Sequence, residues 1–171
     1  FTRAINGKAA ALVAISQAIA QGLELQFKRH IEIIPSVNAG FAPNAEHSAQ
    51  LQAQYAENFI IGQVGALVDR HKGQSVTLKA AALLKVKIPK LKVLFLGSGE
   101  DEATLQELAH NLEVDAEFLG FKQNVADYLP CFDVFAFPSN YEGLGSVLLD
   151  VMAAQVPIVA SEVGGIPDIV K

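Results

Sequence analysis

From residue 59 onward, the chain alternates between short apolar runs and longer segments with apolar residues at helical spacing. The apolar runs predict strands at residues 59–67, 91–97, 114–120, 133–138 and 157–161. The segments between them predict helices at residues 74–85, 101–112, 125–132 and 145–155, with one more beginning near residue 164. Strands and helices in this alternation form a parallel sheet covered on both faces. We therefore expect a doubly wound α/β domain that binds its ligand at the carboxyl ends of the strands.

The first third of the chain has a different pattern. Residues 9–16 are apolar, a helix is expected to begin at Ser16, and residues 31–35 resemble a strand that ends at a proline. Residues 36–58 are rich in Gly, Pro, Asn and Gln, which predicts a linker with one short helix. Because the chain starts at Phe1 and stops in a helix just begun, we expect it to be part of a longer protein.

Composition narrows the class of protein. With a net charge of -5 and no cluster of Lys and Arg, the chain lacks the basic surface that nucleic-acid binding requires. No apolar run approaches the ~20 residues of a membrane-spanning helix. The single cysteine, Cys131, excludes an internal disulfide, and its apolar neighbours indicate a buried core position, which is compatible with a cytoplasmic protein. The four histidines lack metal-ligand spacing, so no metal is expected.

The segment of residues 137–170 carries the strongest chemical signal. Glu142 precedes a predicted helix opened by Gly145 and Ser146, and Asp150 lies one turn, ~6 Å, beyond Ser146. Backbone N–H groups at a helix start favour a phosphate, and carboxylates accept hydrogen bonds from paired hydroxyls. A sugar joined to a ribose through a diphosphate has this order of groups. On spacing alone, an ordinary loop residue and a solvated helix position remain the alternative.

The same segment resembles the signature of a known enzyme family. The pieces PSNYEGLG, DVMAAQ, VPIVAS and GGIP resemble those of retaining glycosyltransferases of the two-Rossmann-domain (GT-B) type, family 4 or glycosyl transferases group 1. This resemblance implies that Glu142 bonds the donor sugar and that Asp150, where Glu is usual, bonds the ribose. It also implies donor contacts around the start of the helix, at Gly143, Leu144, Gly145, Ser146 and Val147.

A second resemblance lies in residues 64–74, VGALVDRHKGQ. Family members carry an Arg and a Lys six residues apart that hold the departing diphosphate; here Lys72 matches, and Ala66 occupies the Arg position. The resemblance implies that Lys72 acts with Glu142 in catalysis and that Gly65 borders the donor. Arg70 and His71 are both candidates to replace the missing cation, and the sequence does not choose between them.

Two glycine turns complete the predicted site. Gly97, Ser98 and Gly99 follow a strand, but Glu102 stands where a dinucleotide fingerprint needs a third Gly, so an NAD site is not expected. Gly99 is instead expected to border the cleft. By resemblance, the loop containing Gly120, Phe121 and Lys122 holds the nucleotide base. The alternative is that Phe121 is a core aromatic residue.

The resemblance spans nearly the whole chain and implies three regions. Residues 1–37 would be the tail of a preceding acceptor-binding domain, 38–58 a linker, and 59–171 a nucleotide-sugar-binding Rossmann-like domain truncated at its C-terminal end. The expected function is transfer of a hexose-type sugar from a nucleoside-diphosphate sugar to a lipid, saccharide or polymer acceptor, with retention of configuration and no cofactor.

This function suggests a role in cell-envelope polysaccharide synthesis. The expected partners are the donor, the acceptor and the missing N-terminal domain in cis. The location would be cytoplasmic, with the intact enzyme peripheral to a membrane, and the chain alone is expected to be inactive. Two alternatives are a nucleotide-sugar epimerase of the same architecture, which would lack the Glu142 and Asp150 pairing, and a nucleotide-sugar-binding module without activity.

Overall fold

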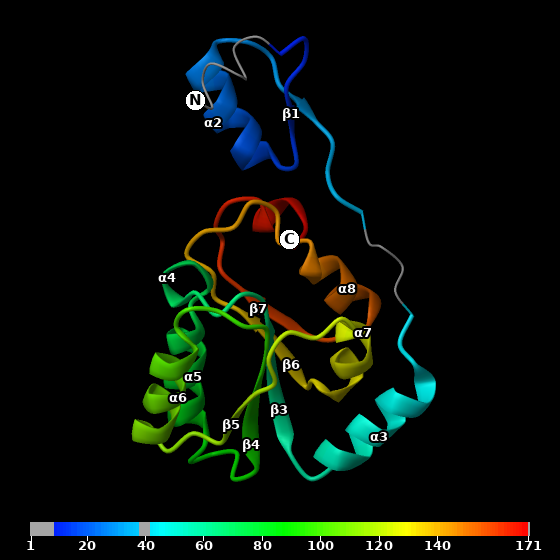
Figure 1. Ribbon diagram of the computed structural model, residues 1–171, viewed down its shortest axis with the longest axis vertical. Coiled ribbons are helices and arrows are strands. Elements are labelled where there is room, and N and C mark those ends of the chain that lie inside the picture. Colours follow the sequence, from blue (N-terminus) through cyan, green and yellow to red (C-terminus); the bar gives the residue numbers. More distant parts are fainter. Residues whose placement is uncertain (1–8, 38–41, 171) are drawn as a thin grey trace.

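The computed structural model describes residues 9–37 and 42–170. A large α/β unit holds the later part of the chain, and a small unit built from residues 9–37 lies beyond one end of it (Figure 1). The predicted regions include residues 1–8, 38–41 and Lys171, which lie outside the described residues. Where the domain boundaries fall stays a prediction.

The large unit is built on a parallel sheet of five strands, as the sequence predicts. Their order is β5-β4-β3-β6-β7. The strands are β3 (Phe59–Val64), β4 (Leu91–Leu96), β5 (Ala116–Phe118), β6 (Val134–Phe137) and β7 (Ile158–Ala160). From β3 the chain first builds outward through β4 to β5, and then returns to the other side of β3 to add β6 and β7. The order therefore reverses between β3 and β6.

Helices cover both faces of this sheet (Figure 1). One face carries α5 (Gln74–Leu84) and α6 (Glu102–Asn111). The other carries α3 (Ala45–Tyr55), α7 (Val125–Tyr128), the 3-10 turn η1 (Leu129–Cys131) and α8 (Val147–Ala153). Burial on both faces explains why the central strands are nearly continuous apolar runs in the sequence.

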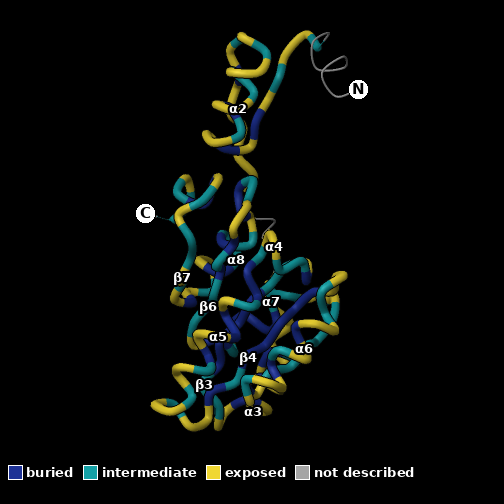
Figure 2. The backbone as a smooth tube through the Cα atoms, turned by 90° about the vertical axis from the view of Figure 1, so that its left-hand side faces the viewer, coloured by how far each residue is buried: buried dark blue, intermediate teal, exposed yellow. Residues whose placement is uncertain are grey.

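Successive strand residues point to opposite faces and fill two separate cores. In β3, Ile60 joins the core under α3, α7 and α8, whereas Ile61 joins the core under α5 and α6. In β4, Leu94 and Phe95 divide in the same way, and both are fully buried. The dark blue stretch through the middle of Figure 2 is this doubly covered sheet. The strands that carry the candidate site are therefore held in a closely packed core.

Three predicted helices differ from the observed ones. The helix expected at residues 125–132 is one α turn followed by η1, because Pro130 has no N–H to continue the α-helical bonding. The helix expected from Gly145 begins at Val147, because Gly145 has a φ of +80°, outside the right-handed helical region. The last helix is only a 3-10 turn, η2 (Ile166–Asp168), within the described chain.

The helix α3 belongs to the large unit. The sequence assigns these residues to a linker with one short helix, because most of them are polar. The structure shows 11 residues of helix, capped by Asn44, whose side chain accepts a hydrogen bond from the His47 N–H. Leu51 and Tyr55 are buried in the core that lies under this helix. Two apolar anchors are thus enough to hold a mostly polar helix on the sheet.

The small unit contains the strand, helix and strand that the sequence predicts. The strands β1 (Val13–Ala14) and β2 (Glu32–Ile33) pair in parallel, and α2 (Gln17–Phe27) connects them. Its buried core consists of Ala14, Ala20 and Ile31. Most residues of the small unit are exposed and are drawn in yellow in Figure 2.

Candidate functional site

The candidate site lies where the strand order reverses. β3 pairs with β4 along its whole length, but with β6 only through Ile61–Val134 and Gly62–Phe135. The two strands therefore separate toward their carboxyl ends, and the loops that follow them face the same opening. In open α/β sheets, ligands bind in the crevice at such a reversal.

The loop after β3 is held firmly in place. It contains the single helical turn α4 (Asp69–Lys72). The buried Gln63 donates a hydrogen bond to the Lys72 carbonyl at 2.8 Å. Gly73 adopts the left-handed conformation, and a Cβ built there would lie 2.2 Å from the carbonyl oxygen of Pro138. Only glycine fits this contact, which places the end of α4 directly on the loop after β6.

The two predicted catalytic residues, Lys72 and Glu142, touch each other. The distance from Lys72 Nζ to Glu142 Oε2 is 2.5 Å, and the side chains are 24% and 13% exposed. Glu142 Oε1 accepts a further bond from the Gly143 N–H at 3.1 Å. Lys72 Nζ lies 5.6 Å from the centroid of the Phe137 ring. The sequence predicts that both residues border one cleft, and their positions agree with this.

Three neighbouring hollows begin at this ion pair. The first, of 340 Å³, is lined by Lys72, Glu142, Ala66, Val68, His71, Tyr141 and Gly143. The second, of 250 Å³, contains Gly65, Phe121, Lys122, Ala66 and Val125 among its lining residues. The third, of 270 Å³, contains Asp150, Asp127, Asn124, Asn44 and Val125. Because Ala66 lines the first and second, and Val125 the second and third, the hollows adjoin in series.

The structure separates the two candidates for the missing cation. Arg70 pairs with the Glu100 carboxylate at 2.9 Å, and both side chains are largely exposed. His71 instead lines the first hollow beside Lys72, with its ring 6.0 Å from that of Tyr141. Its Nε2 lies 3.2 Å from Arg70 Nε, which donates to it. His71 is therefore the better placed of the two.

The remaining predicted site residues differ from one another in burial and in the groups they contact. Phe121 is 73% exposed, so its interpretation as a core aromatic is wrong. Gly99 packs against the Leu67 backbone, where a built Cβ would lie 2.3 Å from the carbonyl oxygen. Gly120 accepts a hydrogen bond from the Gly97 N–H at the end of the sheet. At the start of α8, the Leu144 side chain is buried, Gly145 is buried, Ser146 is exposed, and Val147 packs on the core.

Asp150 lines a different hollow from Glu142. Glu142 precedes α8, and Asp150 lies in the first turn of that helix. Burial raises the pKa of the Asp150 carboxyl above its ordinary value. A partly buried carboxylate gains more from a hydroxyl donor than one fully in water.

A network beside Asp150 has no signal in the sequence. The buried carboxylate of Asp127 accepts hydrogen bonds from the Asn44 N–H at 2.6 Å, from His47 Nδ1 at 2.8 Å and from Asn124 Nδ2 at 2.8 Å. Burial raises the pKa of Asp127, but these bonds outweigh it, so the pKa lies below its ordinary value. The network ties the start of α3 to α7 along one wall of the third hollow.

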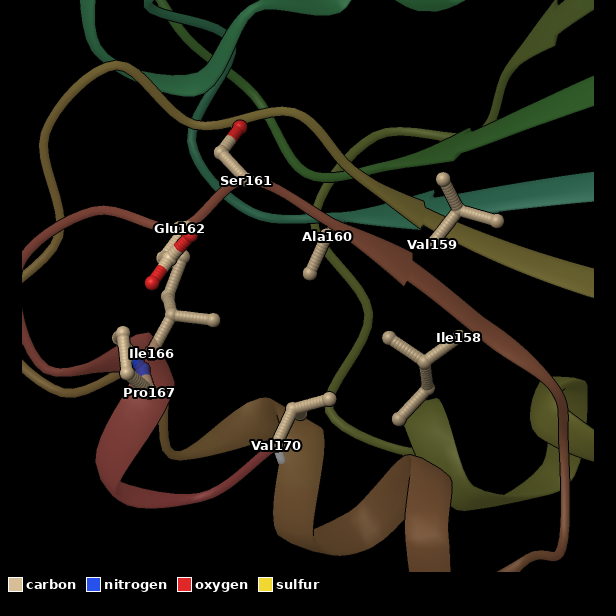
Figure 3. A pocket seen from close by; sticks show the side chains of 8 residues that line it. All are labelled: Ile158, Val159, Ala160, Ser161, Glu162, Ile166, Pro167 and Val170. Atoms are coloured by element: carbon tan, nitrogen blue, oxygen red, sulfur yellow. The ribbon is translucent and has the colours of Figure 1, made fainter.

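A larger cavity, of 530 Å³, lies along β7 (Figure 3). The side chains of Ile158, Ile166 and Val170 point into the same apolar space, and Ser161 and Glu162 lie at one end. Its lining contains neither a cationic side chain nor any predicted site residue. An apolar groove with one carboxylate does not suit a diphosphate, so size alone does not identify the binding site.

Three further observations concern membrane spans, metal sites and the single cysteine. Among residues 9–37 and 42–170, no helix is both long and apolar enough to span a bilayer. Across the same ranges, no three His, Cys, Asp or Glu side chains gather as a metal site would require. Cys131 is half-buried against the core, and burial raises the pKa of its thiol to about 11, so the thiol stays protonated at neutral pH.

Comparison with known proteins points to sugar transfer. Over 172 residues, the chain is 31% identical to the putative glycosyltransferase EpsF of Bacillus subtilis, covering 95% of this chain and 44% of the relative. It is 33% identical over 144 residues to a GDP-mannose-dependent phosphatidylinositol monomannoside mannosyltransferase of Mycolicibacterium smegmatis, covering 76% and 37%. The chain thus spans less than half the length of these relatives.

A solved structure shares the fold. Anabaena HepE, in complex with UDP-glucose, matches with a TM-score of 0.85 at 24% identity, over 98% of this chain and 49% of that one. The sequence profile of glycosyl transferases group 1 matches residues 45–171, which include α3, the whole sheet and every residue of the Lys72–Glu142 site. The chain therefore belongs to the family of glycosyl transferases group 1.

Proposed function

We propose that this chain binds the donor of an enzyme that transfers a sugar from a nucleoside-diphosphate sugar to a lipid, saccharide or polymer acceptor, with retention of configuration. The observation that carries the proposal is the contact between Lys72 and Glu142 at the reversal of strand order. A cation and a carboxylate in one hollow match a ligand in which a diphosphate adjoins a hydroxyl-bearing sugar.

Lys72 would stabilise the leaving group. As the bond between sugar and diphosphate breaks, negative charge grows on the diphosphate, and an ammonium held in place by its backbone contacts stabilises that charge. In the structure, Glu142 neutralises Lys72. A bound diphosphate would become a second partner of Lys72, and the Glu142 carboxylate would then accept bonds from sugar hydroxyls.

His71 would supply a second side-chain contact to the diphosphate. Ala66 lines the same hollow but carries no charge, and Lys72 is already paired with Glu142. Because His71 Nε2 accepts from Arg70 Nε, its Nδ1–H can donate a hydrogen bond to a phosphate oxygen at the wall of this hollow. This assigns to His71 the diphosphate contact for which Arg70, bound to Glu100, is less well placed.

The nucleoside would occupy the other two hollows. Asp150 is proposed to accept bonds from the ribose hydroxyls, and the exposed ring of Phe121 offers a flat apolar surface for the base. Lys122 lies over the Tyr128 ring, 6.0 Å from its centroid, which keeps its chain beside the same hollow. Backbone groups at residues 143–147 would approach the sugar and phosphates.

Two other functions are compatible with this architecture. An epimerase of this architecture is not favoured, because the family match and the Glu142 and Asp150 pair both indicate transfer. A binding module without activity differs from an enzyme only in product formation, so the assay with an acceptor decides between them. A cytoplasmic location, the absence of a cofactor, and a second domain that completes the active site remain predictions.

Donor titration tests the proposal. We expect UDP-glucose or GDP-mannose to bind the chain, and Lys72→Met to weaken that binding about tenfold, because one charge-assisted contact to phosphate is lost. Lys79→Met, an exposed lysine on α5, is the matched control and should leave affinity unchanged. Equal affinities for the Lys72→Met variant and the unmodified chain would remove Lys72 from the site. Turnover by this chain alone, without an acceptor domain, would contradict the proposed division of the active site.

A further inference from the structure

The start of α2 packs against a turn from the far end of the chain. Ser16, the N-cap of α2, is 1% exposed. A Cβ built on Gly165 would lie 2.6 Å from the Ser16 Cβ and 2.3 Å from the Gly143 carbonyl oxygen. Only a residue without a side chain fits between these two neighbours. Gly165 is therefore buried between the small unit on one side and the large unit on the other.

On its other side, the same turn touches the backbone of Glu142. A Cβ on Gly164 would lie only 1.7 Å from the Glu142 carbonyl oxygen, and the Gly165 N–H donates to that oxygen at 3.3 Å. The Ile15 side chain also reaches this segment, 3.5 Å from a Cβ built on Gly143. The Gly164–Gly165 turn thus packs directly on the backbone of residues 142–144, and it meets the start of α2 through the short Ser16 side chain.

A carboxylate from the same region binds the α2 N-terminus. Asp168 Oδ2 accepts a hydrogen bond from the Gln17 N–H at 2.7 Å, across 151 residues of sequence. Ser16 Oγ accepts from the Ile19 N–H. The first N–H groups of a helix have no partner within it and attract negative charge. Two of those groups in α2 are therefore satisfied, one of them by the large unit.

We propose that Asp168 and the Gly164–Gly165 turn are positioning elements, which seat the start of α2 against the segment that carries Glu142. When the small unit is seated, the Gly164–Gly165 turn holds the Glu142 backbone, and the Glu142 carboxylate keeps one orientation toward the donor sugar. When the contact opens, the segment is free to shift. The proposal rests on the sugar-binding role proposed for Glu142.

Amide hydrogen exchange tests the physical contact without any ligand. In Asp168→Ala, we expect exchange to accelerate about fivefold at the Gln17 amide and in residues 141–145, because an exposed bond to a charged group is lost. Glu162→Ala, which removes an exposed carboxylate from the same segment, is the control and should change neither. Asp168→Glu should restore slow exchange. Unchanged exchange in residues 141–145 of Asp168→Ala would overturn the proposal.

Ligand binding tests the consequence for Glu142. Titrations with UDP-glucose and with UDP separate sugar contacts from nucleotide contacts. Asp168→Ala should weaken UDP-glucose several-fold while leaving UDP unchanged, and Asp168→Glu should recover the loss. An equal loss for both ligands would show a general structural defect rather than positioning, and would contradict the proposal. If the unmodified chain binds neither ligand, the donor assignment fails, and the exchange experiment still decides whether the contact couples α2 to Glu142.

Discussion

Replacing Glu142 by Gln is expected to tighten the binding of a free nucleoside diphosphate while slowing sugar transfer. In the structure, Glu142 Oε2 lies 2.5 Å from Lys72 Nζ. A diphosphate must therefore compete with the Glu142 carboxylate for the ammonium group. Glutamine has nearly the same size and can still accept the bond from the Gly143 N–H, but it carries no charge. The substitution thus frees the cation for phosphate and removes a carboxylate from the sugar subsite.

The size of the effect follows from the geometry. Two unit charges 4 Å apart interact by about 4 kcal/mol at the effective dielectric constant near a protein surface. Lys72 and Glu142 are partly exposed, so solvent screens the pair. The ammonium group also has three N–H donors, so it can bond both partners at once. We therefore expect a net gain of about 1 kcal/mol, or about fivefold in Kd.

Calorimetric titration with UDP and with GDP measures this gain. Glu100→Gln is the matched control, because Glu100 also forms an ion pair, with Arg70, but lies outside the first hollow. The rate of transfer is measured in the intact enzyme, where Glu142→Gln should lower kcat more than it raises KM, since the sugar changes most in the transition state. A tenfold loss of diphosphate affinity in Glu142→Gln would refute the reasoning and indicate that Glu142 binds the nucleotide.

Three further predictions concern the neighbouring side chains. Asp150→Ala should weaken nucleoside diphosphate binding by about 1.5–3 kcal/mol in calorimetry, whereas Asp150→Glu should keep or tighten it. His71→Ala should weaken the same binding several-fold and Arg70→Ala should not; the reverse order would return the cation role to Arg70. Asp127→Ala should lower the free energy of unfolding in urea at neutral pH by about 1–3 kcal/mol, because a buried acceptor with three hydrogen bonds is lost. Since its pKa is lowered on folding, Asp127 stabilises the fold above the ordinary Asp pKa, and this difference should vanish as the pH falls through the lowered value.

The sequence predicts most of the large unit because its strands are buried on both faces. Continuous apolar runs such as residues 93–96 have one simple explanation when strands alternate with helices along the chain. The differences are local. Pro130 shortens one helix, and the positive φ of Gly145 delays another, and neither is visible in apolar periodicity. The helix α3 is hard to predict because only Leu51 and Tyr55 bury large side chains in it.

The site is only partly predictable for a different reason. Motif resemblance identifies Lys72 and Glu142, but their direct contact depends on β6 lying beside β3, which strand order decides and periodicity does not. The bond between His47 and Asp127 joins residues 80 apart, and that between Gln17 and Asp168 joins residues 151 apart. Such pairs leave no local pattern, so they appear only once the chain is folded.

The two halves of the proposed donor site form from contacts of very different sequence separation. β3 and β4 meet across a connection of about 32 residues, as the bond from Asn58 to the Lys90 carbonyl shows, while β3 meets β6 across 73. Closing the longer loop costs more conformational entropy. A chain emerging from the ribosome would therefore complete the β3–β4 unit that carries Lys72 well before Glu142 arrives. Until β6 docks, the chain has half a binding site, and a donor cannot assist the early steps of folding.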